Sequence, residues 1–209
     1  MMDYALKHQD QIIQLILEHL HLSLSALAIS LFLGIVVTLV LLRWPRLRQP
    51  SVYFLSLLYA VPSFALFALL IPLTGLGQTT AIIVLSLYAQ YILVRSFLSG
   101  LTEIDVSLVE AGRGMGMTDS QILRMVQLPL ALPAIFAGIK LATTSIIAMA
   151  TIAATINAGG LGTLLFDGLR TASLVKLAWG IGLTVVLSVL LSLVIDFVEE
   201  VVSPEEVSV

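Results

Sequence analysis

Residues 22–42 contain no charged side chain, and this run constrains the fold more than any other feature of the sequence. A helix of this length reaches about 30 Å at 1.5 Å per residue, which matches the hydrocarbon core of a bilayer. Backbone amides inside a bilayer must be hydrogen-bonded within the spanning structure, so only helices or closed barrels cross it. The apolar runs lack the alternating pattern of barrel strands. The sequence therefore predicts an all-α integral membrane protein.

Further apolar runs follow the first one. Only 11% of the residues are charged, against roughly a quarter in soluble domains, so we read these runs as membrane spans. An uncharged run at 51–94 is twice as long as one crossing requires, and the turn formers PLTGLGQTT at 72–80 divide it. We predict five transmembrane helices, at about 22–42, 51–72, 79–98, 133–156 and 177–197.

The distribution of lysine and arginine predicts the orientation, because these residues are retained on the cytoplasmic side. With the amino terminus outside, seven cations lie inside (Arg43, Arg46, Arg48, Arg95, Arg113, Arg124 and Lys140) and three lie outside (Lys7, Arg170 and Lys176). Residues 1–20 then form an amphipathic helix on the outer surface, 21–198 the transmembrane domain, and 199–209 an acidic cytoplasmic tail. Lys140 lies near a helix end, where its side chain can reach the headgroups.

The polar segment at 99–132 is the long cytoplasmic loop of this topology. Residues 103–112 suit a short helix, and Thr118 with Gln121 suits a capping box that opens a second helix. Between them, three glycines permit a tight turn with positive φ: Gly112, Gly114 and Gly116. Two prolines are expected to interrupt the second helix as the chain re-enters the membrane, Pro129 and Pro133.

This loop resembles the EAA motif of permeases from ATP-binding-cassette (ABC) importers. The motif reads Glu-Ala-Ala, three residues, Gly, nine residues, Ile, any residue, Leu, Pro. The matching positions here are Glu110, Ala111, Gly112, Gly116, Val126, Leu128 and Pro129. Gly112 replaces the second alanine, which lowers intrinsic helix stability by about 1 kcal/mol, and Val126 replaces isoleucine and keeps its branching.

The resemblance implies a type I ABC importer permease with a methionine-importer-like core of five spans, in a bacterial inner membrane. A coupling helix would dock on a cytoplasmic ATPase dimer, with these contact residues: Glu110, Ala111, Gly112, Arg113, Met115, Gly116, Met117, Leu128 and Pro129. A second permease and an extracytoplasmic binding protein are the other expected partners. The chain has no GxxxxGK[ST] loop, so we expect ATP and Mg on the ATPase and no cofactor or catalysis here. The alternative to a coupling role for Glu110 is an ordinary solvated carboxylate in a polar loop.

Residues 62–66 (PSFAL), the loop and residues 158–162 (AGGLG) also look like permeases of osmoprotectant importers, which carry glycine betaine, choline or carnitine. The same core occurs in importers of amino acids such as methionine, which remains an alternative. An ion-coupled secondary carrier is a weaker one, because no filter-like loop or acidic group deep in a span stands out.

Six residues are candidates for the translocation pathway or a gate: Pro62, Ser63, Asn157, Gly159, Gly160 and Gly162. Each also has a purely structural interpretation. Pro62 suits a helix kink, the glycines suit a turn, and Asn157 suits a hydrogen bond between helices.

Overall fold

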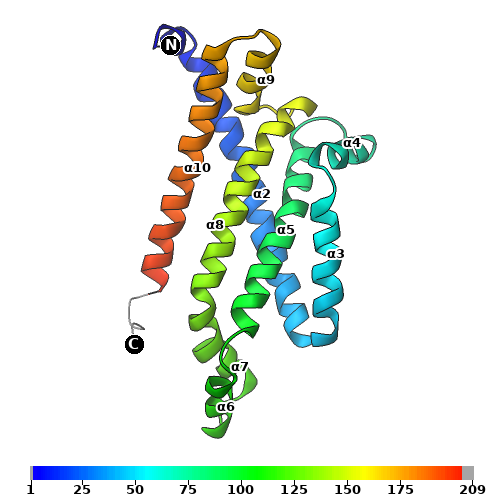
Figure 1. Cartoon of the computed structure of the whole chain (residues 1–209), viewed down its shortest axis with the longest axis vertical. Coiled ribbons are helices and arrows are strands. Elements are labelled where there is room, and N and C mark those ends of the chain that lie inside the picture. The colour runs from blue at the N-terminus through cyan, green and yellow to red at the C-terminus, as the bar shows by residue number, and fades with distance from the viewer. Residues whose placement is uncertain (1, 204–209) are drawn as a thin grey trace.

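The computed structural model describes residues 2–203, and within them the chain is helical without strands (Figure 1). The all-α prediction is therefore confirmed for these residues. The α-helices are α1 (Met2–Lys7), α2 (Gln9–Arg43), α3 (Arg48–Ala60), α4 (Ser63–Thr74), α5 (Gln78–Thr102), α6 (Val106–Gly114), α7 (Asp119–Ile122), α8 (Leu128–Ala153), α9 (Gly162–Arg170) and α10 (Leu174–Val202). Short 3-10 turns cover Pro45–Leu47 and Ala154–Ile156, and a π-helical turn covers Leu123–Gln127.

Four segments are each long and apolar enough to cross a bilayer as one helix: Gln9–Arg43, Gln78–Thr102, Asp119–Ile156 and Leu174–Val202. The segment expected as a straight span at 51–72 is instead a pair of helices bent by 94°. Helix α3 has 13 residues, about 20 Å, and is too short to cross alone. The described residues thus contain four segments that can each cross a bilayer. The number of crossings is five if the bent pair is taken as one further span.

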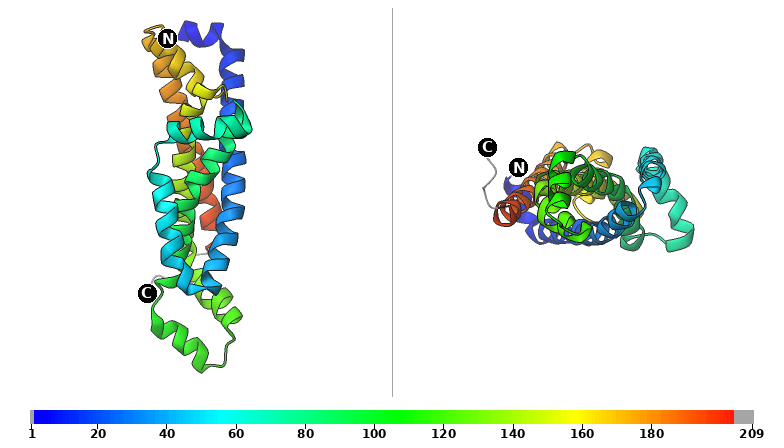
Figure 2. Two further views of the ribbon diagram at one scale, coloured as in Figure 1. Left: turned by 90° about the vertical axis from the view of Figure 1, so that its right-hand side faces the viewer. Right: turned by 90° about the horizontal axis from the view of Figure 1, so that it is seen from below.

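Pro62 produces the bend. Proline has no amide hydrogen, and its ring disfavours the helical conformation at the preceding residue. Val61 is accordingly extended, with φ −65° and ψ 131°, and α4 starts afresh at Ser63. The Tyr88 hydroxyl of α5 donates a hydrogen bond to the Val61 carbonyl oxygen at the break. The bend turns α4 across the bundle axis (Figures 1 and 2).

Two helix ends differ from the sequence prediction. Residues 9–20 belong to α2, so the expected outer-surface helix at 1–20 is not separate from the first span. Helix α10 continues to Val202, and the expected tail at 199–209 begins inside it. Residues 204–209 of that tail lie outside the described part of the chain.

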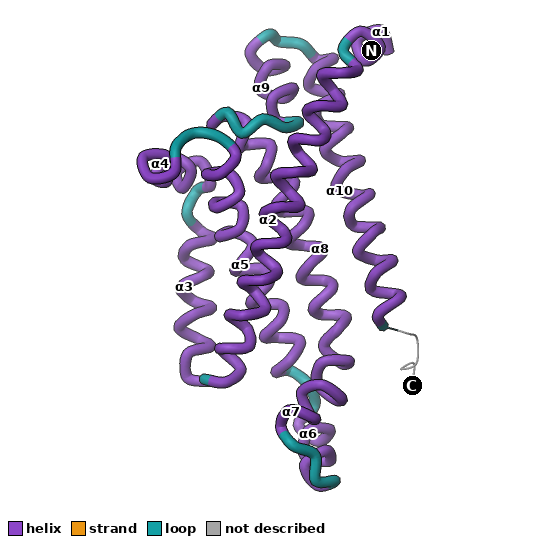
Figure 3. The backbone as a smooth tube through the Cα atoms, turned by 180° about the vertical axis from the view of Figure 1, so that it is seen from behind, coloured by secondary structure: helices purple, strands orange, loops and turns teal. Residues whose placement is uncertain are grey.

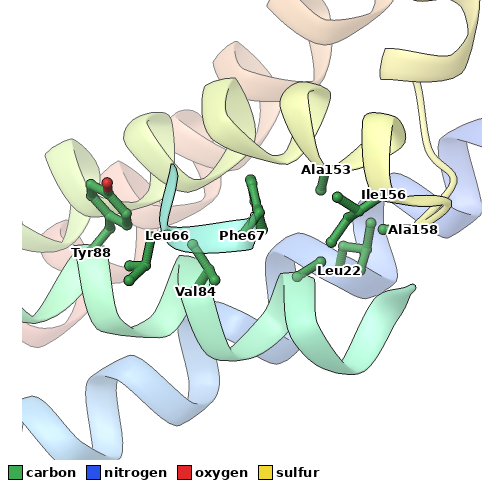
Figure 4. Close-up of a cluster of buried hydrophobic side chains, with 9 residues drawn as sticks. Leu22, Leu66, Phe67, Val84, Tyr88, Ala153, Ile156 and Ala158 are labelled. Atoms are coloured by element: carbon green, nitrogen blue, oxygen red, sulfur yellow. The ribbon is translucent and has the colours of Figure 1, made fainter. Parts of the chain in front are cut away.

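Helix α5 lies at the centre of the bundle, between α2, α3 and α8 (Figure 3). Small residues bring α5 and α8 close together: a Cβ at Gly138 would overlap the Ser96 side chain, and one at Gly100 would lie 2.9 Å from the Ala134 Cβ. Figure 4 shows the core cluster near α4, in which α2, α4, α5 and the end of α8 share one set of buried side chains: Leu22, Leu66, Phe67, Ala81, Val84, Tyr88, Ala153, Ile156 and Ala158.

Helix α10 packs on α8 and α9 at the edge of the bundle (Figure 1). Most of its surface is exposed apolar side chain. An ion pair joins it to α8: Lys140 Nζ lies 2.8 Å from Asp196 Oδ1 and 3.0 Å from Glu199 Oε2. Lys140 therefore has two carboxylate partners on α10, whereas the sequence suggested only that its side chain reaches the headgroups. A cation paired with two carboxylates between helices costs less to place near the membrane than a free one.

Candidate coupling hairpin and outer loop

Helices α6 and α7 form a hairpin that projects beyond one end of the bundle (Figure 2). Helix α6 covers Val106–Gly114 and starts three residues later than the 103–112 helix predicted from the sequence. Asp105 is its N-cap, and its carboxylate accepts a hydrogen bond from the Ser107 amide at 2.9 Å. This bond favours the charged carboxylate and lowers the pKa of Asp105.

The turn of the hairpin depends on one glycine. Gly116 has φ +80°, whereas Gly112 and Gly114 lie within α6, so the expectation of positive φ at those two positions is wrong. The Gly116 amide donates to the Arg113 carbonyl (2.9 Å), and the Met117 amide donates to the Gly112 carbonyl (3.1 Å). These two bonds form a Schellman motif, which satisfies the last carbonyls of α6 and requires a left-handed residue, here Gly116.

The predicted capping box at the start of α7 is confirmed. The Gln121 amide donates to Thr118 Oγ1 at 3.3 Å, and the Thr118 amide donates to Gln121 Oε1 at 2.8 Å. Ile122 is buried beneath the hairpin and lies against Gly112, where a Cβ would be 3.4 Å from the Ile122 Cγ1. Helix α6 thus packs on α7 at Gly112, where the close approach of Ile122 suits a small residue.

The hairpin presents its remaining side chains to the outside. Glu110 is exposed and has no ion pair within residues 2–203, and the Met115 side chain is 75% exposed. The Arg113 guanidinium lies 3.7 Å from the Asp119 carboxylate across the hairpin. Methionine and arginine are enriched at protein-binding surfaces, and this projecting element presents Met115 and Arg113 to the outside.

The last two residues of the motif lie elsewhere. Leu128 and Pro129 begin α8, away from the tip of the hairpin. The expected interruption by Pro129 and Pro133 does not occur: residues 119–156 run on as one segment. The π-helical turn at Leu123–Gln127 precedes Pro129, which lies in the first turn of α8, where a missing amide hydrogen is tolerated.

The opposite end of the bundle holds the glycine-rich loop between α8 and α9. Gly159 and Gly160 have φ +82° and +80°, and Asn157 is also left-handed at +61°. The Gly160 amide donates to Glu18 Oε2 at 2.9 Å, and the Leu161 amide donates to His19 Nδ1 at 3.3 Å. A Cβ at either glycine would overlap Glu18 or His19. The glycines therefore let the loop lie directly on α2.

His19 connects three parts of the protein although its side chain is fully buried. Its Nε2 lies 3.1 Å from the Ile147 carbonyl of α8, while Nδ1 accepts from the loop. These partners require the tautomer with the proton on Nε2. Sequence reasoning did not assign a role to Glu18 or His19. The sequence did contain a signal, since Glu18 and His19 are two adjacent polar residues just before the uncharged run at 22–42.

The candidate pathway residues fall into two neighbouring groups. Gly162 starts α9, and a Cβ there would overlap the Thr151 backbone of α8. It shares the loop with Asn157, Gly159 and Gly160. Pro62 and Ser63 lie at the α3–α4 break, and the helix that they begin packs through Phe67 into the same cluster as Ile156 and Ala158 (Figure 4).

Next to this loop, α9 carries an ion cluster at the end of the bundle opposite the hairpin. Asp167 pairs with Lys176, and Arg170 Nη2 lies 2.8 Å from Asp167 Oδ1. The hydrogen bond from Lys176 and then that from Arg170 lower the pKa of Asp167. The Asp167–Lys176 pair links α9 to the start of α10, whereas the Asp167–Arg170 pair lies within α9.

Chains from solved structures of ABC transporters have the same fold. The methionine transporter MetNI in an inward-facing conformation matches with a TM-score of 0.83, 23% identity and coverage of 94% of this chain and 98% of that chain. An amino acid ABC transporter crystallised with histidines matches with a TM-score of 0.75, 15% identity and 97% coverage of both chains. The methionine-importer-like fold expected from the sequence is thus confirmed.

Residues 21–206 match the family described as binding-protein-dependent transport system inner membrane component, and the chain belongs to this family. The carnitine transport permease OpuCB of Listeria monocytogenes is 39% identical over 153 residues, which cover 73% of this chain and 70% of the relative. The osmoprotectant import permease OsmW of Salmonella typhimurium is 34% identical over 207 residues, with 97% and 96% covered. The resemblance to osmoprotectant permeases seen in the sequence is confirmed.

Proposed function

We propose that this chain pairs with a second permease to form the pathway of an ATP-driven importer. The α6–α7 hairpin would dock on a cytoplasmic ATPase dimer, which binds and hydrolyses ATP with Mg, and a separate binding protein would deliver the substrate at the other end. The observation that carries this proposal is the projecting hairpin, with its capped helix and exposed Glu110 and Met115, in a chain of the binding-protein-dependent family.

The proposed substrates are quaternary ammonium osmoprotectants. Relatives with 32–39% identity are named for carnitine, choline or glycine betaine, which share a trimethylammonium group. The solved amino acid transporters have no more than 23% identity and support the fold alone. We therefore favour a trimethylammonium compound over methionine as the substrate.

The proposed orientation places the hairpin in the cytoplasm and the amino terminus outside. The hairpin and α9 lie at opposite ends of the bundle (Figure 1). Arg43, Arg48 and Arg113 line one cavity at the hairpin end, whereas Arg170 belongs to α9 and Lys176 to the start of α10. Cations are retained on the cytoplasmic side of a membrane. The outer loop with Asn157, Gly159, Gly160 and Gly162 would then face the binding protein, and α4 would lie beside the outer mouth of the pathway with Pro62 and Ser63 at its start.

Uptake measurements test this function. Vesicles that contain the permease, its partner and the ATPase are expected to accumulate labelled glycine betaine, carnitine or choline only when binding protein is outside and ATP is inside. Non-hydrolysable ATP is the control and is expected to give no accumulation. Accumulation driven by an ion gradient without ATP would contradict the proposal and favour a secondary carrier.

Replacing Glu110 with alanine is expected to reduce stimulation of ATP hydrolysis by loaded binding protein about tenfold. Glu110 has no ion-pair partner among residues 2–203, so its carboxylate is free to form a charge-assisted hydrogen bond with the ATPase, and such bonds contribute about 1.5–3 kcal/mol. The control is Glu103→Ala, which removes an exposed carboxylate outside the motif. Unchanged stimulation in Glu110→Ala would count against coupling through this residue.

A further inference from the structure

A basic cavity of about 540 Å³ lies where α2 and α5 end and the hairpin begins. Three arginines line it, Arg43, Arg48 and Arg113, against a single carboxylate, Asp119. The cavity is at membrane-interface level, because the neighbouring Trp44 is 57% exposed directly after α2, and tryptophan is enriched at that depth. An excess of guanidinium groups in a cavity favours an anionic occupant.

The three arginines differ in the partners that their guanidinium groups have within the protein. Arg48 donates through Nε to the Leu41 carbonyl (3.0 Å) and through Nη2 to the Leu42 carbonyl (3.2 Å), which caps the end of α2 without neutralising the cation. Arg113 lies 3.7 Å from the Asp119 carboxylate. Arg43 forms no hydrogen bond or ion pair with any described residue of this chain. No described carboxylate therefore neutralises Arg43 or Arg48, and both side chains line the same cavity.

An apolar groove of about 430 Å³ adjoins this cavity along the membrane-embedded part of the bundle. The two share Leu39 and Leu101 as lining residues. From Leu39 the groove follows α2 to Leu31, about 12 Å at 1.5 Å per residue. Apart from the buried Thr38, its lining is apolar side chain from α2, α5, α8 and the end of α10.

We propose that the cavity and the groove together bind one anionic phospholipid. The phosphate would lie between the guanidinium groups of Arg43 and Arg48, which suit bidentate hydrogen bonds to phosphate oxygens, and an acyl chain would follow the groove from Leu39 toward Leu31. A basic pocket at the end of an apolar groove matches both parts of such a lipid, whereas a soluble anion or an acidic protein segment matches the basic part alone. Anionic lipids are abundant at the cytoplasmic surface of membranes.

The headgroup half of the site is tested by native mass spectrometry of the full-length chain, co-purified with its partners in mild detergent and titrated with phosphatidylglycerol. Arg43→Gln is expected to weaken phosphatidylglycerol binding about fivefold, because one cation near the membrane surface contributes this much to attraction of an anionic lipid. Arg46→Gln is the matched control, since Arg46 is three residues away and does not line the cavity. Phosphatidylcholine binding is expected to be unchanged in both variants.

The part of the site that would hold the acyl chain is tested by a substitution that fills the groove. Ile35 lines it and is half exposed, so Ile35→Trp is expected to occupy the acyl path and weaken phosphatidylglycerol binding without disturbing the fold. Val36→Trp is the control, because Val36 is similarly exposed on the same helix but lies outside the groove. Thermal unfolding of each variant checks that the bundle is intact.

Three results would overturn the proposal. The first is equal phosphatidylglycerol affinity in Arg43→Gln and Arg46→Gln. The second is competition by glycerol 3-phosphate as strong as that by the lipid, with no effect of Ile35→Trp, which would indicate a site for soluble anions. The third is loss of the ATPase from Arg43→Gln with unchanged lipid binding, which would identify an acidic group of the ATPase as the partner of Arg43.

Discussion

Gly116→Val is expected to lower the affinity of the permease for its ATPase about tenfold while leaving membrane insertion intact. No atom lies within 4 Å of the position that a Cβ would take at Gly116, so the substitution does not crowd the hairpin. The cost arises from the backbone: φ is +80°, and a β-branched residue in the left-handed region loses about 1–2 kcal/mol. The Schellman turn would open and α6 would change direction relative to α7.

The measurement is the binding of purified ATPase to the permease in detergent or nanodiscs. Gly116→Asn separates backbone conformation from side-chain bulk, because asparagine tolerates the left-handed region and valine does not. The asparagine variant is expected to keep most of the affinity. Gly114→Ala is a second control, since Gly114 is helical and equally open. Equal losses in the asparagine and valine variants would show that bulk, rather than the turn, limits docking.

Gly162→Ala is expected to destabilise the outer end of the bundle by about 3 kcal/mol, near the top of the usual range for overpacking. The added methyl group would overlap the Thr151 carbonyl oxygen and lie 2.7 Å from its carbon and 2.8 Å from the Thr151 Cα. These are backbone atoms of α8, which cannot move aside as a side chain does. The first turn of α9 would separate from α8, and the loop that rests on Glu18 and His19 would shift with it.

Thermal unfolding in detergent measures this effect, together with the yield of folded protein. Gly182→Ala is the matched control, because Gly182 lies on an exposed face of α10 with no atom within 4 Å of its would-be Cβ. That control is expected to be neutral or slightly stabilising, since alanine favours helix over glycine. Equal stability of Gly162→Ala and Gly182→Ala would contradict the close packing of α9 on α8.

The sequence by itself determined the helical class, the approximate positions of four spans and the capped hairpin between the third and fourth predicted spans. These features depend on local physics. Apolar length follows from bilayer thickness, and the Thr118–Gln121 box acts within four residues. Each part of that information is contained in a short stretch of chain. The same locality explains why the motif from Glu110 to Pro129 is recognisable in the sequence, since its positions span only twenty consecutive residues.

Only the tertiary structure decided the 94° angle of the bend at Pro62, the contacts of the outer loop and the ion pair of Lys140. Proline at 62 permits either a kink within one span or a break between two helices, and the structure has the break, with α4 packed on α5 and α8. Glu18 and His19 meet Gly160 and Leu161 across 142 positions, and Lys140 meets Asp196 across 56. Such pairings depend on which helices become neighbours when the bundle packs, and no periodicity within a single helix contains that information.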